Sequence, residues 1–249
     1  MEVLNIEVYL LLGLASFCAG FLNALAGGGT FFTLPALLFA GLPPVTANAT
    51  NAAVLLPGYL GAVLGLKKSL DKVDKSRLLL LLLFVISGSL IGSFLLINTP
   101  NIVFRRLAPW LILLATLLFL VGPALSKFTN DFLENVSLER IGLLVVSGYG
   151  GYFNGGLGIA LMAVFSVSGN KDMEEMLALK SLFSSVMTFV SVIAFTVAGL
   201  VFWPLALGLM VLTTFGGYLG AYAALSLSSK FVNKFVIFVG LTVSALLFI

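Results

Sequence analysis

Residues 21–44 read FLNALAGGGTFFTLPALLFAGLPP, an apolar stretch that contains an asparagine and three consecutive glycines. Each of Gly27, Gly28 and Gly29 weakens a helix by about 1 kcal/mol relative to alanine. Irregular backbone within a lipid bilayer is tolerated only where protein shields it or where it lines a water-filled cavity. The stretch therefore predicts a membrane helix that is interrupted for a structural or functional reason.

The whole chain has the composition of a protein embedded in a lipid bilayer. Of its 249 residues, 60% are hydrophobic and 9% are charged, with a mean hydropathy of +1.17, whereas a soluble domain has about 25% charged residues. With one cysteine, Cys18, and no histidine, the chain has no internal disulfide and too few ligands for a zinc, iron or copper site. We predict no cofactor, and the net charge of +3, which comes from loops, does not indicate a nucleic-acid partner.

Apolar runs bounded by charged or turn residues predict ten helical segments, and so an all-α polytopic membrane protein. The predicted segments are 7–26, 30–42, 45–66, 78–97, 102–125, 139–156, 158–168, 174–199, 202–226 and 231–249. The second and the seventh have about 11 to 13 residues, fewer than the ~20 that a helix needs to cross the hydrocarbon core. These two are predicted to be half-helices or re-entrant segments.

The distribution of Lys and Arg predicts the orientation in the membrane. The loop KKSLDKVDKSR, residues 67–77, holds five basic residues, and cytoplasmic loops are enriched in such residues. Placing this loop inside, and counting each segment as one change of side, puts both termini outside. Arg105 and Arg106 then also fall outside, against the general trend.

An internal repeat is visible when the chain is shifted by 131 residues, which aligns Asn23 with Asn154 and Ala47 with Ala178. Both halves contain a long segment, a glycine-rich break, a short segment and three long helices in the same order. Because five segments per half is an odd number, the second half enters from the opposite side, which predicts an inverted-topology repeat of the kind found in secondary transporters. We therefore divide the chain into a first repeat, 1–126, and a second repeat, 127–249.

The two breaks are the predicted binding site. In inverted-repeat transporters the broken helices meet near the bilayer midplane, and the N-terminus of each half-helix, with its unpaired N–H groups, faces an anion. The candidate substrate-binding residues are Asn23, Gly27, Gly28, Gly29 and Thr30 at the first break and Asn154, Gly155, Gly156 and Gly158 at the second. The alternative is that the glycines allow close helix packing, but packing does not explain why each break precedes a segment too short to span.

For three other glycine pairs we expect helix packing alone, since they show the small-xxx-small pattern. These pairs are Gly61 with Gly65, Gly88 with Gly92, and Gly216 with Gly220.

Polar residues within the predicted spans supply further candidates. Lys180 lies inside the eighth segment and either marks the substrate path or extends to the membrane interface near Glu174 or Glu175. The neighbouring Ser181, and Asn48, Thr50 and Asn51 on the counterpart helix, either bind the anion or hydrogen-bond neighbouring helices. All ten acidic residues fall in loops or near helix ends, and we expect no buried carboxylate, a pattern that suits an anion path.

At the breaks the chain resembles the TauE/SafE family of sulfite and organosulfonate exporters. The first half contains AGGGTFFTLPALLFAGLPP followed by ANATNAAVL, and the second half contains the weaker counterparts FNGGLGIALMAVF and ALKSLF. The second half departs from the first in having Ser166 at the position of Pro35 and Ser181 at that of Thr50. The resemblance implies an anion transporter of the inner or plasma membrane, with sulfite, sulfoacetate or a related sulfur oxyanion as substrate.

We predict from these features a transporter of small anions that works by alternating access around the paired breaks. A channel-like anion pore and a non-transporting membrane assembly subunit remain as alternatives, and the sequence does not decide between a monomer and a homo-oligomer. We expect no enzymatic activity, because no histidine or buried acid is available to activate a serine or Cys18.

Overall fold

The computed structural model describes residues 5–25, 27–71, 73–128, 136–168, 172–223 and 229–248, which form eleven α-helices and no strand. The helices are α1 (Ile6–Leu25), α2 (Thr30–Phe39), α3 (Pro44–Gly65), α4 (Lys67–Leu70), α5 (Lys75–Ile97), α6 (Asn101–Phe128), α7 (Val136–Tyr152), α8 (Leu157–Val167), α9 (Met173–Val197), α10 (Trp203–Ala223) and α11 (Ser229–Phe248). Each of the ten predicted segments corresponds to one of these helices. The four-residue α4, within the basic loop, was not predicted.

Both predicted interruptions are present, and each is made by a glycine in the left-handed conformation. Gly27 has φ +85° and Gly156 has φ +69°, a region that glycine enters without the steric cost paid by other residues. The N–H of Gly27 donates to the carbonyls of Leu22 and Asn23 and so closes the end of α1 in the manner of a helix C-cap. The sixth predicted segment, 139–156, was extended too far, because α7 ends at Tyr152 and the following residues form the break.

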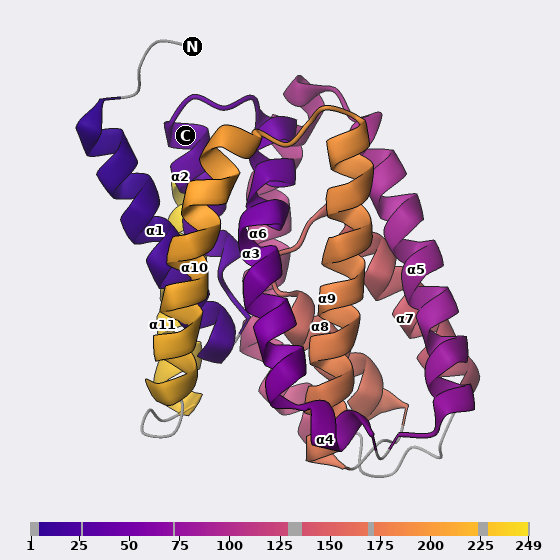
Figure 1. Ribbon diagram of the computed structural model, residues 1–249. Helices are drawn as coiled ribbons and strands as arrows, with labels where there is room; N and C mark the ends of the chain where they lie inside the picture. The colour runs from indigo at the N-terminus through magenta and orange to yellow at the C-terminus, as the bar shows by residue number, and fades with distance from the viewer. Residues whose placement is uncertain are drawn as a thin grey trace.

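The two short helices turn back from opposite ends of the bundle (Figure 1). α1 starts at the upper end in this view and α2 returns toward it, whereas α7 starts at the lower end and α8 returns toward that end. α1 packs along α10, α5 packs along α7, and α3 and α9 contact each other in the centre. This arrangement supports the inverted relationship of residues 1–126 and 127–249, which itself stays a prediction.

Close packing at glycines holds the paired helices together. A side chain on Gly92 of α5 would collide with the Gly148 carbonyl of α7, and one on Gly220 of α10 would collide with the Phe21 carbonyl of α1. Gly88 and Gly216 face the same two neighbouring helices at equally short range. The expected packing role is confirmed for these two pairs.

For Gly61 of α3 the expected packing role is wrong. No described atom lies within 4 Å of a Cβ built on this glycine. The surroundings of its predicted partner, Gly65, lie outside what the structure describes.

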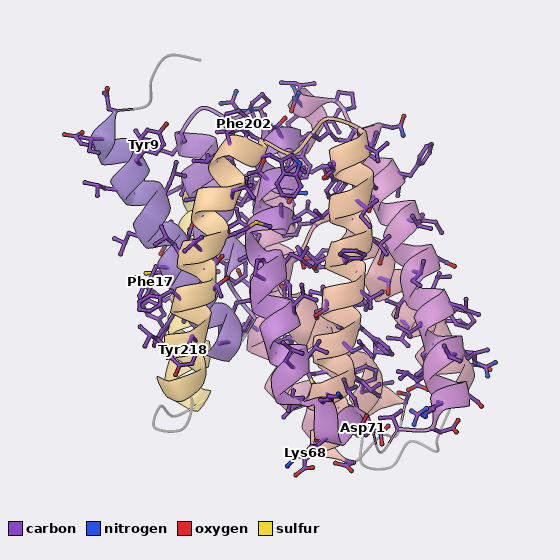
Figure 2. The ribbon with its side chains drawn as sticks, in the orientation of Figure 1. Tyr9, Phe17, Lys68, Asp71, Phe202 and Tyr218 are labelled. Atoms are coloured by element: carbon purple, nitrogen blue, oxygen red, sulfur yellow. The ribbon has the colours of Figure 1, made fainter. Side chains whose placement is uncertain are left out.

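The outer surface of the bundle is apolar, as a lipid-facing surface must be. Five helices of the described chain are long and apolar enough to cross a membrane, by length and composition. Tyr9, Phe17 and Tyr218 lie along the outer side formed by α1 and α10 (Figure 2). Lys68 and Asp71 of the basic loop lie at the end of the bundle opposite to Tyr9. The protein is therefore a multi-pass membrane protein.

Candidate functional site

The two breaks meet inside the bundle. A Cβ built on Gly27 would lie 3.8 Å from the Cα of Gly158 and 3.9 Å from its backbone nitrogen. Both glycines are buried, and the end of α1 and the first turn of α8 lie close together at this point. A Cβ at Gly27 would make an ordinary van der Waals contact with Gly158.

Lys180 joins this junction from α9. A Cβ built on Gly158 would lie 3.4 Å from Cε and 3.7 Å from Nζ of Lys180, so the lysine lies against the first turn of α8. Its side chain is half-buried, and no hydrogen bond or ion pair joins it to any residue that the structure describes. The lysine charge thus lies beside a helix N-terminus, which carries about half a positive charge. The arrangement concentrates positive potential within the bundle.

Both asparagines of the aligned repeat reach one turn of α3. The Tyr59 hydroxyl donates to Oδ1 of Asn154 over 3.4 Å, and Nδ2 of Asn23 would lie 3.8 Å from a Cβ built on Gly58. Nδ2 of Asn154 also donates to Thr188 Oγ1 of α9 over 2.9 Å. The Oδ1 atom of Asn23 is buried and has no hydrogen-bond partner among the described residues. The structure therefore brings Asn23, Asn154 and α3 together next to the breaks.

Thr30 and Asn51 contact each other and fasten α2 to α3. Nδ2 of Asn51 donates to Thr30 Oγ1 over 3.4 Å, and the Thr33 hydroxyl donates to Asn51 Oδ1. All three side chains are buried. Their polar groups form hydrogen bonds with one another in this conformation. For Asn51 this agrees with the predicted alternative of a hydrogen bond to a neighbouring helix.

Asn48, Thr50 and Ser181 are also engaged in internal hydrogen bonds. Asn48 Nδ2 donates to the Tyr152 carbonyl at the end of α7 over 2.9 Å, and its Oδ1 is buried without a partner in the described chain. Thr50 Oγ1 accepts from the Phe202 N–H before α10 over 3.0 Å. Ser181 donates to the Leu177 carbonyl of its own helix over 2.8 Å. No hydrogen bond of the described chain joins Thr50 or Ser181 to the glycines of the breaks.

The remaining predicted glycines are tightly surrounded by protein. A Cβ on Gly28 would lie 3.0 Å from Val236 of α11, and one on Gly29 would lie 2.8 Å from the Ala19 carbonyl of α1. Built Cβ atoms on Gly155 and Gly156 would lie 2.5 Å from Phe153 and 3.0 Å from Ala115, respectively. These four positions serve the turn and the packing around it, whereas Gly27 and Gly158 form the contact itself.

Thr188 was not among the residues predicted from the sequence. It follows Ser184 by four residues and Ser185 by three, spacings that place side chains on one helical face. Both serines and Thr188 are buried in α9. Extending the polar face of the eighth segment by one turn would have identified Thr188.

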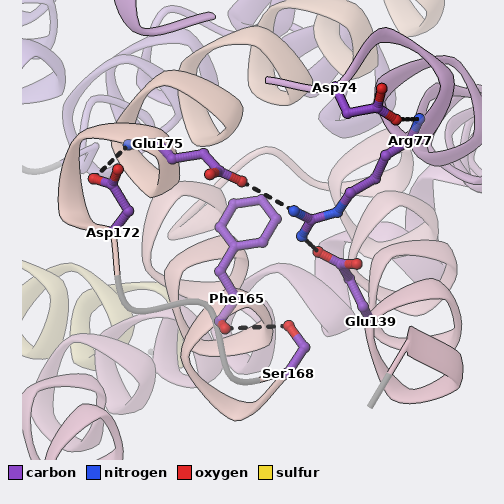
Figure 3. Close-up of polar contacts among 7 residues, drawn as sticks. All are labelled: Asp74, Arg77, Glu139, Phe165, Ser168, Asp172 and Glu175. Atoms are coloured by element: carbon purple, nitrogen blue, oxygen red, sulfur yellow. Dashed lines mark hydrogen bonds and ion pairs between the residues drawn. The ribbon is translucent and has the colours of Figure 1, made fainter. Parts of the chain in front are cut away.

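The expectation that no carboxylate is buried is wrong for Glu139. This residue lies in the first turn of α7 and is 3% exposed. Its Oε1 lies 2.7 Å from Nη2 of Arg77, and Nη1 of the same arginine lies 3.1 Å from Oε1 of Glu175 in α9 (Figure 3). Arg77 thus ties the starts of α5, α7 and α9 together, and burial of Glu139 is stabilised by this pairing and by the helix N-terminus.

Interrupted helices that enter an all-helical membrane bundle from opposite ends, as here (Figure 1), are typical of secondary transporters. Comparison with known proteins agrees, because residues 12–247 match the family described as "Sulfite exporter TauE/SafE". The chain belongs to this family of membrane transporters.

Three relatives illustrate the similarity. The chain is 28% identical over 246 residues to a "Probable membrane transporter protein" of Haemophilus influenzae, covering 97% of this chain and 95% of that protein. It is 26% identical over 247 residues to "Probable membrane transporter protein YfcA" of Escherichia coli K12, covering 95% and 89%. It is 29% identical over 166 residues to "Probable membrane transporter protein ORF9" of Sinorhizobium sp, covering 66% and 63%. No solved structure is significantly similar to the chain.

Proposed function

We propose that this transporter carries a small anion, a sulfur oxyanion or organosulfonate such as sulfite or sulfoacetate, between the two helix breaks. The observation that carries the proposal is the position of Lys180 against Gly158, at the point where Gly27 also makes contact. An intramembrane charge is costly unless it is paired or faces a water-filled path. Since Lys180 has no partner in the described chain, an anionic substrate supplies the missing charge.

The chemistry of the junction suits an oxyanion. In the first turn of α8 the N–H groups of Ile159 and Ala160 donate to the Gly156 carbonyl, whereas those of Leu157 and Gly158 have no acceptor within the helix. Gly158 adds no side chain that would keep a ligand away from these two groups. Lys180 contributes three N–H donors and a full charge. Sulfite and sulfonate groups present several oxygens to donors arranged in this way.

Transport requires the contact between the breaks to open. In this conformation Gly27 and Gly158 lie close together, so an anion enters between them only when the α1–α2 and α7–α8 hairpins separate. Because the hairpins enter from opposite ends of the bundle (Figure 1), movement of one exposes the junction to one side and movement of the other exposes it to the opposite side. This is alternating access around a fixed site.

The proposal is tested with purified protein in lipid vesicles by uptake of ³⁵S-labelled sulfite. We expect Lys180→Met to weaken the apparent affinity by about 10- to 100-fold, the loss associated with a hydrogen bond to a charged group, and Lys180→Arg to retain more of it. Lys68→Met, which alters an exposed lysine of α4, is the matched control and should transport normally. Unchanged affinity in Lys180→Met would contradict the site.

A second measurement distinguishes a carrier from a pore. Vesicles preloaded with unlabelled sulfite should take up labelled sulfite faster than empty vesicles, because a carrier returns to the outer-facing state more quickly when it is loaded. A pore shows no such acceleration, so its absence would leave the site in place but overturn alternating access.

We also propose that the basic loop lies in the cytoplasm and that both termini lie outside the cell membrane, since the loop carries the largest cluster of Lys and Arg. A cysteine introduced at Ser69 in a Cys18→Ala background should be protected from a membrane-impermeant thiol reagent in intact cells. Labelling of this cysteine from outside would reverse the orientation.

A further inference from the structure

Arg105 and Arg106 line a cavity that lies apart from the helix breaks. The cavity has a volume of about 890 Å³ and is bounded by the end of α2, the turn that leads into α3, the start of α6 and the end of α11. Apart from the arginines, the lining residues are glycine, alanine, proline, leucine and the aromatic residues Trp110 and Phe248, whose side chains are largely apolar. The cavity therefore combines two cations with an apolar wall.

The walls of this cavity are held in place by specific contacts. Asn101 Oδ1 accepts the Val45 N–H over 3.0 Å and ties the start of α6 to the start of α3. Ser244 donates to the Pro109 carbonyl over 3.0 Å and ties α11 to α6. Trp110 and Phe248 pack edge to face with ring centroids 4.9 Å apart. The cavity is thus a built feature of the fold.

The charges of both arginines are uncompensated. Arg105 and Arg106 are exposed, and neither makes a hydrogen bond or ion pair with any residue that the structure describes. They lie in the first two turns of α6, which starts just after α5 has carried the chain away from the basic loop to the other end of the bundle. In the orientation proposed above, the distribution of charges in membrane proteins disfavours arginine at this end. Two unpaired cations retained at this end indicate an anionic partner.

The surroundings of the arginines favour a lipid as that partner. Trp110 follows Arg106 by four residues on the same helical face and is 61% exposed, and Ile102 and Val103 in the first turn of the same helix are exposed as well. Tryptophan at the end of a membrane helix lies at the level of the lipid headgroups, and arginine extends to the same level. A free inorganic anion would leave the leucine and tryptophan wall uncovered, whereas the glycerol and acyl chains of a lipid would cover it.

We propose that this cavity binds an anionic phospholipid, with the lipid phosphate between Arg105 and Arg106 and the first part of an acyl chain against Trp110 and the leucines. The volume lies within the range of about 300–1,000 Å³ typical of small-molecule sites, which fits a headgroup and the adjoining carbons. Binding at this place fastens α2 to α6 and α11 from the lipid side. The site is independent of the anion path proposed above.

The test uses the fluorescence of Trp110, since the chain has only one other tryptophan, Trp203. The full-length protein carrying Trp203→Phe is placed in nanodiscs that contain brominated phosphatidylglycerol in a phosphatidylcholine background, and bromine quenches tryptophan at contact. We expect brominated phosphatidylglycerol to quench Trp110 at lower lipid fractions than brominated phosphatidylcholine does. Arg105→Gln with Arg106→Gln should weaken the apparent affinity on the order of tenfold, given the contribution of each basic residue near anionic lipid.

Two controls keep the outcome decisive. Lys67→Gln with Lys68→Gln removes two exposed lysines at the opposite end and should leave the quenching unchanged, and all variants should melt at the wild-type temperature in phosphatidylcholine. Equal quenching by both lipids, or quenching that survives loss of both arginines, would overturn the proposal. Displacement of the brominated lipid by millimolar inorganic phosphate would also overturn it and assign the cavity to a free anion instead.

Discussion

The two helix breaks use the same device for chain reversal but differ in what surrounds the short helix that follows. At the first break, Thr30 and Asn51 bond to each other, and the glycines next to the short helix pack against α1 and α11. At the second break, Gly158 faces the side chain of Lys180. The comparison teaches that a repeated glycine pattern encodes the interruption, whereas a lysine side chain lies against Gly158 at the second break and not among the described neighbours of the first.

The largest effect that separates the two breaks is expected on stability. Gly156→Ala places alanine at φ +69° and brings its Cβ to 3.0 Å from Ala115, so we expect a loss of roughly 2–4 kcal/mol from backbone strain and overpacking together. Gly27→Ala has the same strain at φ +85° but a nearest neighbour at 3.8 Å, so the loss should be about 1–2 kcal/mol. Melting temperatures in detergent measure both.

Gly61→Ala is the matched control for these two substitutions, because Gly61 lies in a helix with open space around it. It should not lower the melting temperature, since alanine favours a helix by about 1 kcal/mol over glycine. Equal losses of stability in Gly27→Ala and Gly156→Ala would contradict the steric difference between the breaks.

A smaller effect should separate binding from structure. Gly158→Ala brings a methyl group to 3.4 Å from the flexible Lys180 side chain and meets no backbone, so the protein should remain folded while anion affinity falls by about threefold to tenfold, a fraction of the lysine contribution.

Thr30→Val should instead lower the stability without changing the anion affinity. The expected loss of stability is about 1 kcal/mol, the net value of a buried hydrogen bond. Uptake assays and thermal melting of both variants check this, and a Thr30→Val protein with weakened affinity would place the anion at the first break as well.

The smallest effect is expected at Tyr59. Its hydrogen bond to Asn154 is long, at 3.4 Å, so Tyr59→Phe should cost no more than about 0.5–1 kcal/mol of stability and leave uptake within about twofold of wild type. A large loss of uptake without a loss of stability would instead indicate that Tyr59 contacts the substrate.

Much of the fold could be predicted because its determinants are local. Each long helix must satisfy its own backbone hydrogen bonds within the bilayer, so apolar length and the positions of glycine and proline place the segments. The short helices after Gly29 and Gly156 followed from this rule. The four-residue α4 did not, because it lies in a polar loop where no such requirement acts.

The candidate site was only partly predictable. The asparagines, glycines and Lys180 were found by the repeat and by the cost of intramembrane charge, but pattern alone did not separate the glycines that pack against neighbouring helices, such as Gly29, from Gly158, which faces Lys180. The burial of Glu139 beside Arg77 joins residues that are 62 positions apart, and no local pattern encodes such a pairing.

The sequence by itself determined that this is an all-helical membrane protein with two interrupted segments, because hydrophobicity and glycine content act along the chain. Only the tertiary structure decided that Gly27 meets Gly158, that Lys180 lies against this contact, and that Thr30 and Asn51 bond to each other instead. The physical reason is that these neighbours come from helices distant in the chain, and their meeting depends on how whole helices pack, as at the close contacts of Gly92 and Gly220.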